Sequence, residues 1–134
     1  MDSASCALRL LYYPPVPQNS PPNLYGPAPH TDFGDLTLMA QDDVGRLQFE
    51  IPDGHWVDAH KGENSLMVNI GDMFHRMTNG VLKSTPHQVI NRSGKERYSC
   101  AFFFDPHVSF TVVPLPETGD PKFESLNFGE FLRH

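Results

Sequence analysis

The sequence predicts an all-β fold, and three observations support this prediction. The chain has 134 residues, a length that fits one domain with one hydrophobic core. It contains 13 Pro and 10 Gly, which implies many turns between short elements. Short apolar runs alternate with clusters of Gly, Pro, Asn and Asp, which are typical of turns. Many short strands at close spacing indicate a sandwich, a barrel or a jelly roll.

In the first half of the chain we expect a strand at residues 8–13, followed by an extended loop that begins at Pro14. Seven prolines lie between residues 14 and 29, and proline both lacks a backbone donor and restricts the residue before it. Turn sequences such as Pro-Asp-Gly and Lys-Gly-Glu-Asn separate the next apolar runs. These runs predict strands at residues 36–40, 47–51, 56–58 and 65–70.

In the second half, residues 73–79 are expected to form a short irregular turn. Strands are then expected near residues 81–83, 87–91, 97–104 and 109–113. The sequence Asn-Arg-Ser-Gly-Lys at 91–95 is typical of a hairpin loop between two of these strands. Apolar residues in the tail at 123–132 have a loose helical spacing, which predicts a short C-terminal helix.

Composition disfavours several classes of partner. The formal net charge is -6 and the Lys and Arg residues are scattered, so no nucleic-acid partner is expected. No membrane association is expected, because no apolar run approaches the about 20 residues that span a bilayer. Cys6 and Cys100 do not form a disulfide framework or a zinc-type spacing, which favours a cytoplasmic location. A small-molecule substrate is the remaining expectation.

A candidate metal motif lies at His30-Thr31-Asp32. On an extended backbone, residues two apart point to the same face, so this imidazole and this carboxylate could bind one ion together. Two histidines and one carboxylate on one side of Fe(II) leave three coordination positions open. The His-x-Asp pattern alone is a weak signal, because it is frequent by chance.

The third ligand is expected to be His87, one of seven histidines. His87 begins a strand-like run after Ser-Thr-Pro, whereas His75 lies in an expected turn and is a weaker candidate. Positions in or near turns, or at the chain end, indicate solvated or structural roles for four others: His55, His60, His107 and His134.

A second candidate site lies on the strand that begins at Arg97. Alternate residues share one face, so Arg97 lies beside Ser99, Ala101 and Phe103. A guanidinium beside a hydroxyl can bind a carboxylate, and the aromatic ring provides an apolar end. The alternative is a surface arginine at a hairpin end; the apolar run at 102–104 indicates instead that the strand enters a core.

Five ordered blocks of the sequence resemble the 2-oxoglutarate and Fe(II)-dependent dioxygenases. In more detail they resemble the branch that includes isopenicillin N synthase and the plant flavonoid and gibberellin oxygenases. The likeness runs from about Leu8 to the C-terminus. The blocks are His-Thr-Asp-Phe-Gly-Asp-Leu-Thr-Leu-Met-Ala-Gln-Asp from His30, Val-Asn-Ile-Gly-Asp-Met from Val68, Thr-Asn-Gly from Thr78, Ser-Thr-Pro-His from Ser84 and Arg-Tyr-Ser from Arg97.

This resemblance implies a double-stranded β-helix, or jelly roll, with Fe(II) held at one open end. The implied iron ligands are His30, Asp32 and His87. The resemblance further implies a catalytic domain over residues 1–134 that lacks the family's N-terminal region. Surface left uncovered by that region could be buried by self-association.

The resemblance also implies that 2-oxoglutarate is the cosubstrate and that Arg97 and Ser99 bind its distal carboxylate. Tyr13 corresponds to a cosubstrate-binding tyrosine of the family, although core packing explains it equally well. Phe33 and Phe103 are candidates for an apolar wall of the substrate pocket, and Phe33 could equally belong to the core.

The implied activity is the oxidation of a small organic substrate by dioxygen, coupled to oxidative decarboxylation of 2-oxoglutarate. Two alternatives stay open. One is an oxidase of the isopenicillin N synthase type that does not use 2-oxoglutarate. The other is a truncated, non-catalytic jelly-roll module that binds metal.

Overall fold

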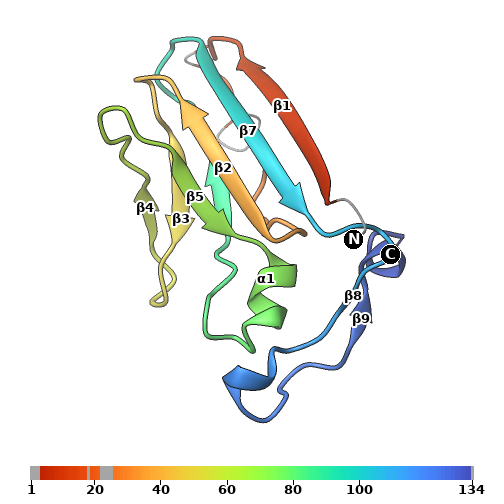
Figure 1. Ribbon diagram of the computed structural model, residues 1–134. Coiled ribbons are helices and arrows are strands. Elements are labelled where there is room, and N and C mark those ends of the chain that lie inside the picture. The colour runs from red at the N-terminus through yellow and green to blue at the C-terminus, as the bar shows by residue number, and fades with distance from the viewer. Residues whose placement is uncertain (1–3, 18, 22–25, 134) are drawn as a thin grey trace.

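The computed structural model describes residues 4–17, 19–21 and 26–133, and it has the predicted all-β jelly-roll architecture. A four-stranded antiparallel sheet lies in front of a three-stranded antiparallel sheet (Figure 1). Short helices lie at the lower end of these two layers. The described parts of the proline-rich loop, up to Pro29, contain no helix or strand; Gln18 and residues 22–25 of that predicted loop lie outside the described residues.

The strand bounds agree closely with the apolar runs of the sequence. The large sheet has the order β1 (Ser5–Tyr13), β7 (Arg97–Asp105), β2 (Leu36–Gln41) and β5 (Met67–Ile70). The small sheet has the order β4 (Trp56–Asp58), β3 (Leu47–Glu50) and β6 (His87–Val89). The remaining elements are α1 (Asp72–Met77), β8 (Thr111–Val112), the 3-10 turn η1 (Pro116–Thr118), β9 (Leu126–Asn127) and α2 (Phe128–Phe131).

Two apolar clusters hold these layers together. The main cluster consists of Met39, Leu47, Val89 and Ala101, which come from both sheets and are at most 9% exposed. A second cluster joins Met73 of α1 to Val112 and Phe128 of the C-terminal segment. The C-terminal segment therefore packs on α1 and is anchored by its own core.

The segment expected as an irregular turn at 73–79 is wrong in part, because residues 72–77 form helix α1. The helix ends where the Thr78 hydroxyl donates to the carbonyl of Phe74 at 2.9 Å. Asn79 and Gly80 then adopt positive φ angles of 54° and 80°. The strand expected at 81–83 is also wrong, because the amide of Leu82 donates to the Thr78 hydroxyl in a continuation of this turn.

The hairpin expected at 91–95 is wrong as well. Strand β6 pairs with β3 in the small sheet, whereas β7 pairs with β1 and β2 in the large sheet. The loop therefore crosses between sheets. Asn91, only 2% exposed, organises it by donating to the carbonyl of Lys95 at 2.8 Å and accepting from the Ser93 hydroxyl at 2.6 Å.

The C-terminal helix is real but shorter than the predicted 123–132. Only residues 128–131 are helical, and they follow strand β9. Asn127 caps the helix because its side-chain oxygen accepts from the amide of Glu130 at 3.1 Å. Likewise β5 begins at Met67 instead of 65, and β8 covers only two residues of the predicted 109–113.

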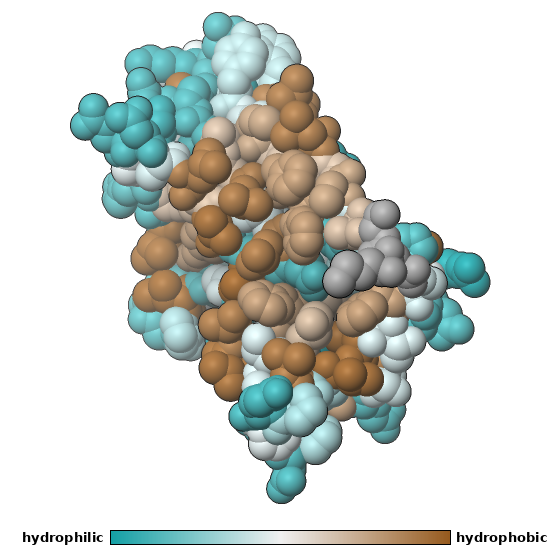
Figure 2. All heavy atoms as spheres, in the orientation of Figure 1, coloured by the Kyte–Doolittle hydropathy of each residue, from teal (hydrophilic) through white to brown (hydrophobic). Residues whose placement is uncertain are grey.

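The outer face of the large sheet is apolar and exposed (Figure 2). Leu8 and Leu10 of β1 are 64% and 77% exposed, and Phe102 and Phe104 of β7 are 36% and 40% exposed. Within the run at 102–104, only Phe103 packs against the main core cluster. Among the described residues, no helix is long and apolar enough to cross a membrane.

The turn at Asn79 generates a prediction about stability. Asn79 is 1% exposed, and its side chain bonds to the carbonyls of Thr118 and Asp120 and to the amide of Lys122. Asn79→Ala removes these three bonds and should lower the free energy of unfolding by about 2 kcal/mol, measured by urea denaturation.

Asn64→Ala is the matched control for this change. Asn64 has a similar positive φ of 51°, but it is exposed and its side chain makes no hydrogen bond with a described residue. Both variants carry the same backbone penalty, so their difference isolates the side-chain bonds. Equal losses in the two variants would show that Asn79 acts through its backbone alone.

Candidate metal centre

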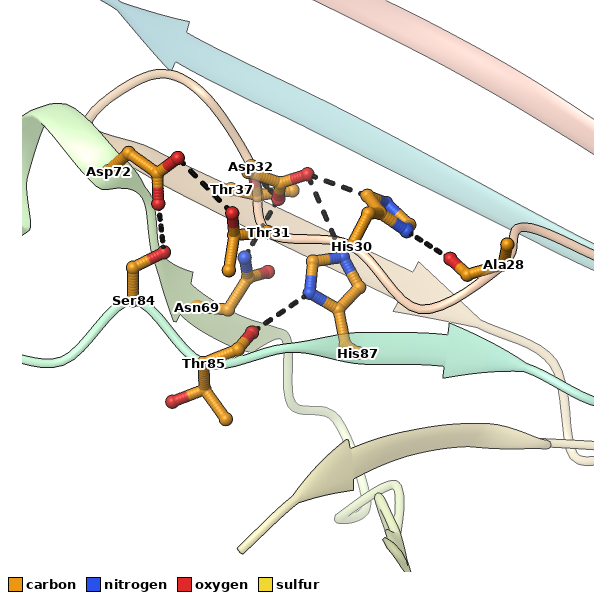
Figure 3. A network of polar contacts seen from close by, with 10 residues as sticks. All are labelled: Ala28, His30, Thr31, Asp32, Thr37, Asn69, Asp72, Ser84, Thr85 and His87. Atoms are coloured by element: carbon orange, nitrogen blue, oxygen red, sulfur yellow. Dashed lines mark hydrogen bonds and ion pairs between the residues drawn. The ribbon is translucent and has the colours of Figure 1, made fainter. Parts of the chain in front are cut away.

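Two histidines are brought side by side by a backbone bridge. The amide of His30 donates to the carbonyl of His87 at 3.1 Å, and the amide of His87 donates back at 2.9 Å. Their ring centroids lie 4.4 Å apart (Figure 3). His87 begins β6, and His30 and Asp32 lie in the loop before β2. The two segments far apart in sequence thus meet at one end of the jelly roll.

The carboxylate of Asp32 completes a cluster of three potential ligands. Its Oδ1 lies 3.9 Å from Nε2 of His30 and 3.6 Å from Nε2 of His87. Its Oδ2 accepts from the Thr37 hydroxyl at 2.5 Å and from the Asn69 amide at 2.8 Å. Because Oδ2 is engaged by two donors, Oδ1 is the atom that faces the histidines (Figure 3).

Neighbouring carbonyls select one tautomer of each neutral ring. Nδ1 of His30 lies 2.7 Å from the carbonyl oxygen of Ala28, and Nδ1 of His87 lies 3.2 Å from that of Thr85. A carbonyl can only accept, so each Nδ1 carries the hydrogen and donates it. Each Nε2 then presents a lone pair, which is the form in which histidine binds a metal.

Asp72 ties the two ligand-bearing segments together. It accepts from the Thr31 hydroxyl at 3.1 Å and from the Ser84 hydroxyl at 2.6 Å. Its amide, at the start of α1, donates to the carbonyl of Asp32 at 2.8 Å. A Cβ on Gly71 would lie 2.3 Å from the carbonyl oxygen of Gly34, so only glycine allows α1 to approach this closely.

The donor set suits a transition metal. The three ligand atoms lie within 4.8 Å of one another. Two imidazole nitrogens and one carboxylate oxygen form the ligand set of non-haem Fe(II) sites. His87 is 4% exposed, whereas the side chain of His30 is 42% exposed. The cluster is thus enclosed on one side and open on another, where further ligands could reach a metal.

The other histidines of the described chain join no such three-residue cluster. His55 is exposed and pairs with Asp53 at 3.1 Å. Nδ1 of His75 lies 2.6 Å from the carbonyl oxygen of Leu82, and Nδ1 of His107 lies 2.8 Å from the Ser109 hydroxyl. His60 is exposed, and His134 lies outside the described residues.

Arg97 is completely buried, so the alternative of a surface arginine is wrong. Its guanidinium donates to the Ser99 hydroxyl at 3.0 Å, to the Gln41 side chain at 3.1 Å and to the carbonyl of Gly45. These acceptors are all neutral, and no described carboxylate lies within ion-pair distance. Burial lowers the pKa of Arg97, and an arginine stays charged nonetheless. A buried cation without a carboxylate in contact favours the binding of an anion.

Tyr13 lies directly beside Arg97. Strand β1 pairs with β7 in a register that sets Tyr13 opposite Arg97 and Leu11 opposite Ser99. The guanidinium carbon of Arg97 lies 4.8 Å from the centroid of the Tyr13 ring. Tyr13 also contacts the main core cluster. Both roles expected for Tyr13 are therefore compatible with its position.

A cavity of about 570 Å³ opens beside the metal-binding cluster. Phe33 and Phe103 both line it, together with His30 and Asp32. Phe33 is 59% exposed and meets the ring of Phe131 edge-on at 5.7 Å, so it does not belong to the core. The two predicted wall residues thus come from different parts of the chain and meet at one opening.

Sequence reasoning missed several residues that support the cluster. Thr37, Asn69, Asp72 and Ser84 were given no role, although all four stand inside blocks that carry the resemblance. Thr37 also carries a signal of its own, because it is a polar residue in the apolar run at 36–40. A hydroxyl that is 1% exposed must find a partner in the interior.

Two further carboxylates lie near the cluster. Burial and the Asp105 carboxylate raise the pKa of Asp35 from its ordinary 3.8 to about 6. Burial and the Asp32 carboxylate raise the pKa of Asp105 as well. Oδ1 of Asp35 has no hydrogen-bond partner among the described residues. The immediate surroundings of Asp35 and Asp105 therefore disfavour additional negative charge.

Known proteins with similar sequences and structures agree with this site. The 2OG-Fe(II) oxygenase superfamily matches residues 4–106. The chain is 40% identical over 118 residues to the 2-oxoglutarate-dependent dioxygenase citB of Monascus ruber. The aligned residues cover 86% of this chain and 36% of citB. The chain thus spans little more than a third of the length of the curated relatives it matches.

Two solved structures are also similar. One is a full-length Neurospora crassa protein in complex with alpha-KG and thymine, with a TM-score of 0.88 and 34% identity over 96% of this chain and 43% of that chain. The other is JOX2 in complex with 2OG, Fe and JA, with a TM-score of 0.86 and 32% identity over 97% of this chain and 39% of that chain.

The raised pKa of Asp35 predicts a pH dependence of stability. The folded chain holds this proton more tightly than the unfolded chain, so the free energy of unfolding falls as the pH rises from about 4 to about 6. Asp35→Asn should remove this loss. We expect the metal-free variant to gain about 1 kcal/mol at neutral pH, a figure reduced for solvent screening, and to gain nothing near pH about 3.5.

Urea denaturation of the metal-free protein across this pH range measures the effect. Asp120→Asn is the control, because Asp120 is exposed and its substitution should leave the pH profile unchanged. A profile of Asp35→Asn that runs parallel to that of the parent would show that Asp35 does not hold this proton in the folded state.

Proposed function

The chain belongs to the 2OG-Fe(II) oxygenase superfamily, and on this premise we propose that residues 1–134 form the catalytic domain of a non-haem Fe(II) oxygenase. The proposed reaction couples oxidative decarboxylation of 2-oxoglutarate to the oxidation of a small organic substrate. The convergence of His30 Nε2, Asp32 Oδ1 and His87 Nε2 is the observation that carries this proposal. We assign these three atoms as the protein ligands to iron.

The three ligands approach from one side and leave positions open for the cosubstrate and dioxygen. When bound, Fe(II) supplies the redox chemistry that converts 2-oxoglutarate and dioxygen to succinate and carbon dioxide, with the second oxygen atom available to oxidise the substrate. The chain positions this chemistry. Thr37 and Asn69 hold one carboxylate oxygen of Asp32 and so orient the other.

We propose Arg97 and Ser99 as the site for the distal carboxylate of 2-oxoglutarate, with Tyr13 beside them. The guanidinium is buried and meets no carboxylate among the described residues, which supports an anionic ligand there. Both similar solved structures contain this cosubstrate, as alpha-KG in the Neurospora crassa protein and 2OG in JOX2. These observations favour a 2-oxoglutarate-dependent enzyme over an oxidase of the isopenicillin N synthase type and over a non-catalytic module.

The cavity of about 570 Å³ is the proposed substrate pocket, with Phe33 and Phe103 as its apolar walls. A space of this size holds a small organic molecule. Apolar walls beside the ligand cluster exclude water from the reacting centre. The thymine held by the similar Neurospora crassa structure is a molecule of this size class.

The exposed outer face of the large sheet supports a proposal about assembly. Large uncovered apolar patches are rare on monomers, so we propose that this chain self-associates through the outer faces of β1 and β7. Sedimentation velocity at increasing concentration tests this, and Leu10→Glu should shift the protein to monomer.

No nucleic-acid or membrane partner is proposed. Cys6 and Cys100 are free thiols, which fits a cytoplasmic location.

The first functional prediction concerns iron. Asp32→Ala removes a ligand and its charge, so Fe(II) affinity should fall by more than about 100-fold; Thr37→Val removes only a supporting bond and should cost about 10- to 100-fold. Anaerobic titration with Fe(II) measures both. Asp53→Ala, at an exposed carboxylate, is the control. Unchanged iron binding in Asp32→Ala would show that the ligand assignment is wrong.

The second functional prediction concerns the cosubstrate. Arg97→Lys keeps a positive charge but loses the planar fork, so the 2-oxoglutarate concentration required for half-maximal succinate release should rise, at a cost of about 1–3 kcal/mol. Fe(II) affinity should change much less. Arg46→Lys, at an exposed arginine, is the matched control. Equal losses of both affinities would indicate misfolding, and a parent that ignores 2-oxoglutarate would favour the oxidase alternative.

A further inference from the structure

The cavity beside the metal-binding cluster contains one permanently charged cation among its lining residues, Arg9 of β1. Its guanidinium carbon lies 5.7 Å from the centroid of the Phe103 ring. Stacking of this kind fixes the plane of a guanidinium without using its N–H donors. No described carboxylate lies within ion-pair distance of Arg9. The donors of Arg9 are therefore free to bind a ligand.

The simplest alternative is that Arg9 is a solvated surface charge. Arg9 is itself exposed, but it lies on the opposite face of β1 from Leu8 and Leu10, and on that face it lines the cavity. A strand suited to solvation would place its charge outward and its leucines inward. In β1 the order is inverted, and Arg9 lines the cavity instead.

A second arginine lies on this face where the cosubstrate is proposed to bind, although Arg97 is buried and Arg9 is exposed. Arg97 on β7 stacks with Tyr13 on β1, and Arg9 on β1 stacks with Phe103 on β7. The two strands pair along their full length, so both arginines lie on the inner face of one ribbon. Arg97 lies at one end of this inner face, and Arg9 lies nearer the end that holds the metal-binding cluster.

The remaining lining residues make the two ends of the cavity differ in charge. Phe33 and Phe103 provide flat apolar walls, and Ala7 and Gly34 are too small to fill the space. Asp105 also lines the cavity, but it pairs with Ser5, whereas Arg9 pairs with Ala101. This separates their backbones by four residues along the strand, or roughly 13 Å. An anionic group would thus be repelled at the Asp105 end and attracted at the Arg9 end.

We propose that Arg9 anchors the carboxylate of the substrate, an organic acid whose flat, unsaturated body lies between Phe33 and Phe103. The inference rests on the proposed function and adds the substrate class to it. A guanidinium matches a carboxylate with two parallel hydrogen bonds, so it fixes the orientation of the acid as well as its charge. The acid then lies with its body beside the metal ligands His30 and Asp32.

The test compares acids with their neutral amides. The protein is loaded anaerobically with Fe(II) and saturating 2-oxoglutarate, so that Arg97 is occupied, and is titrated calorimetrically with cinnamate, cinnamamide, phenylacetate and phenylacetamide. In the parent each acid should bind at least about ten-fold more tightly than its amide. Arg9→Gln should bring this ratio close to one. Arg9→Lys keeps the charge and should restore part of the preference.

The acid-to-amide ratio is measured within each variant, so partial loss of folded protein does not change it. Arg46→Gln, at an exposed arginine, is the matched control and should keep the ratio of the parent. A parent with no preference for the acids, including one that binds neither member of a pair, overturns the inference. Retention of the preference in Arg9→Gln overturns it too.

The proposed function fails in a different way. If the parent shows no Fe(II)-dependent binding of 2-oxoglutarate, that function is wrong, and the inference falls with it. If 2-oxoglutarate binds and only the acid preference is missing, the function stands and Arg9 has no role in choosing the substrate.

Discussion

The pair of backbone hydrogen bonds between His30 and His87 is the constraint on which the rest of the site depends. It joins the loop between β1 and β2 of the large sheet to the first residue of a strand in the small sheet. Thr37 on β2 and Asn69 on β5 then hold Asp32 from the large sheet. The ligand cluster is therefore a product of both layers, and neither layer would form it alone.

A polar interior follows from this arrangement. The inner row of the large sheet carries Thr37, Gln41, Arg97 and Ser99, all buried, while leucine and phenylalanine side chains lie exposed on the outer face. Hydrogen bonds among the inner residues compensate for much of their desolvation. The usual relation between burial and polarity is thus inverted across one sheet. The same sheet therefore presents a polar inner surface and an apolar outer surface.

Much of this could be predicted from the sequence because period-two patterns and turn residues are local. The strands at 36–41 and 97–105 were predicted almost to the residue, and so was the all-β class. Pairing could not be predicted in this way. The loop at 91–95 has the composition of a hairpin, yet the strands that it joins belong to different sheets, because their partners are set by burial far away in sequence.

The site shows the same limit. His30 and Asp32 converge as two residues of one motif, whereas the approach of His87 depends on a bridge that no local pattern reveals. The complete burial of Arg97 could likewise not be predicted with certainty from the sequence, because a charged residue at a loop end is ordinarily exposed. Helix α1 was missed because six residues with one turn of apolar spacing do not differ from an irregular turn. Its start is stabilised by backbone groups of the 32–35 loop, which are tertiary contacts.

The hydrogen bonds that orient the three proposed ligands have a consequence for metal supply. Ala28, Thr85, Thr37 and Asn69 bond to the atoms of these side chains that are not proposed to bind the metal, so the orientation of the site is set by protein groups. A rigid set of two imidazoles and one carboxylate ranks divalent ions in the Irving–Williams order, in which copper and zinc bind more tightly than iron. Raw affinity alone therefore does not favour iron over these competitors. Correct metalation then depends on which ions the surrounding compartment makes available while the chain folds.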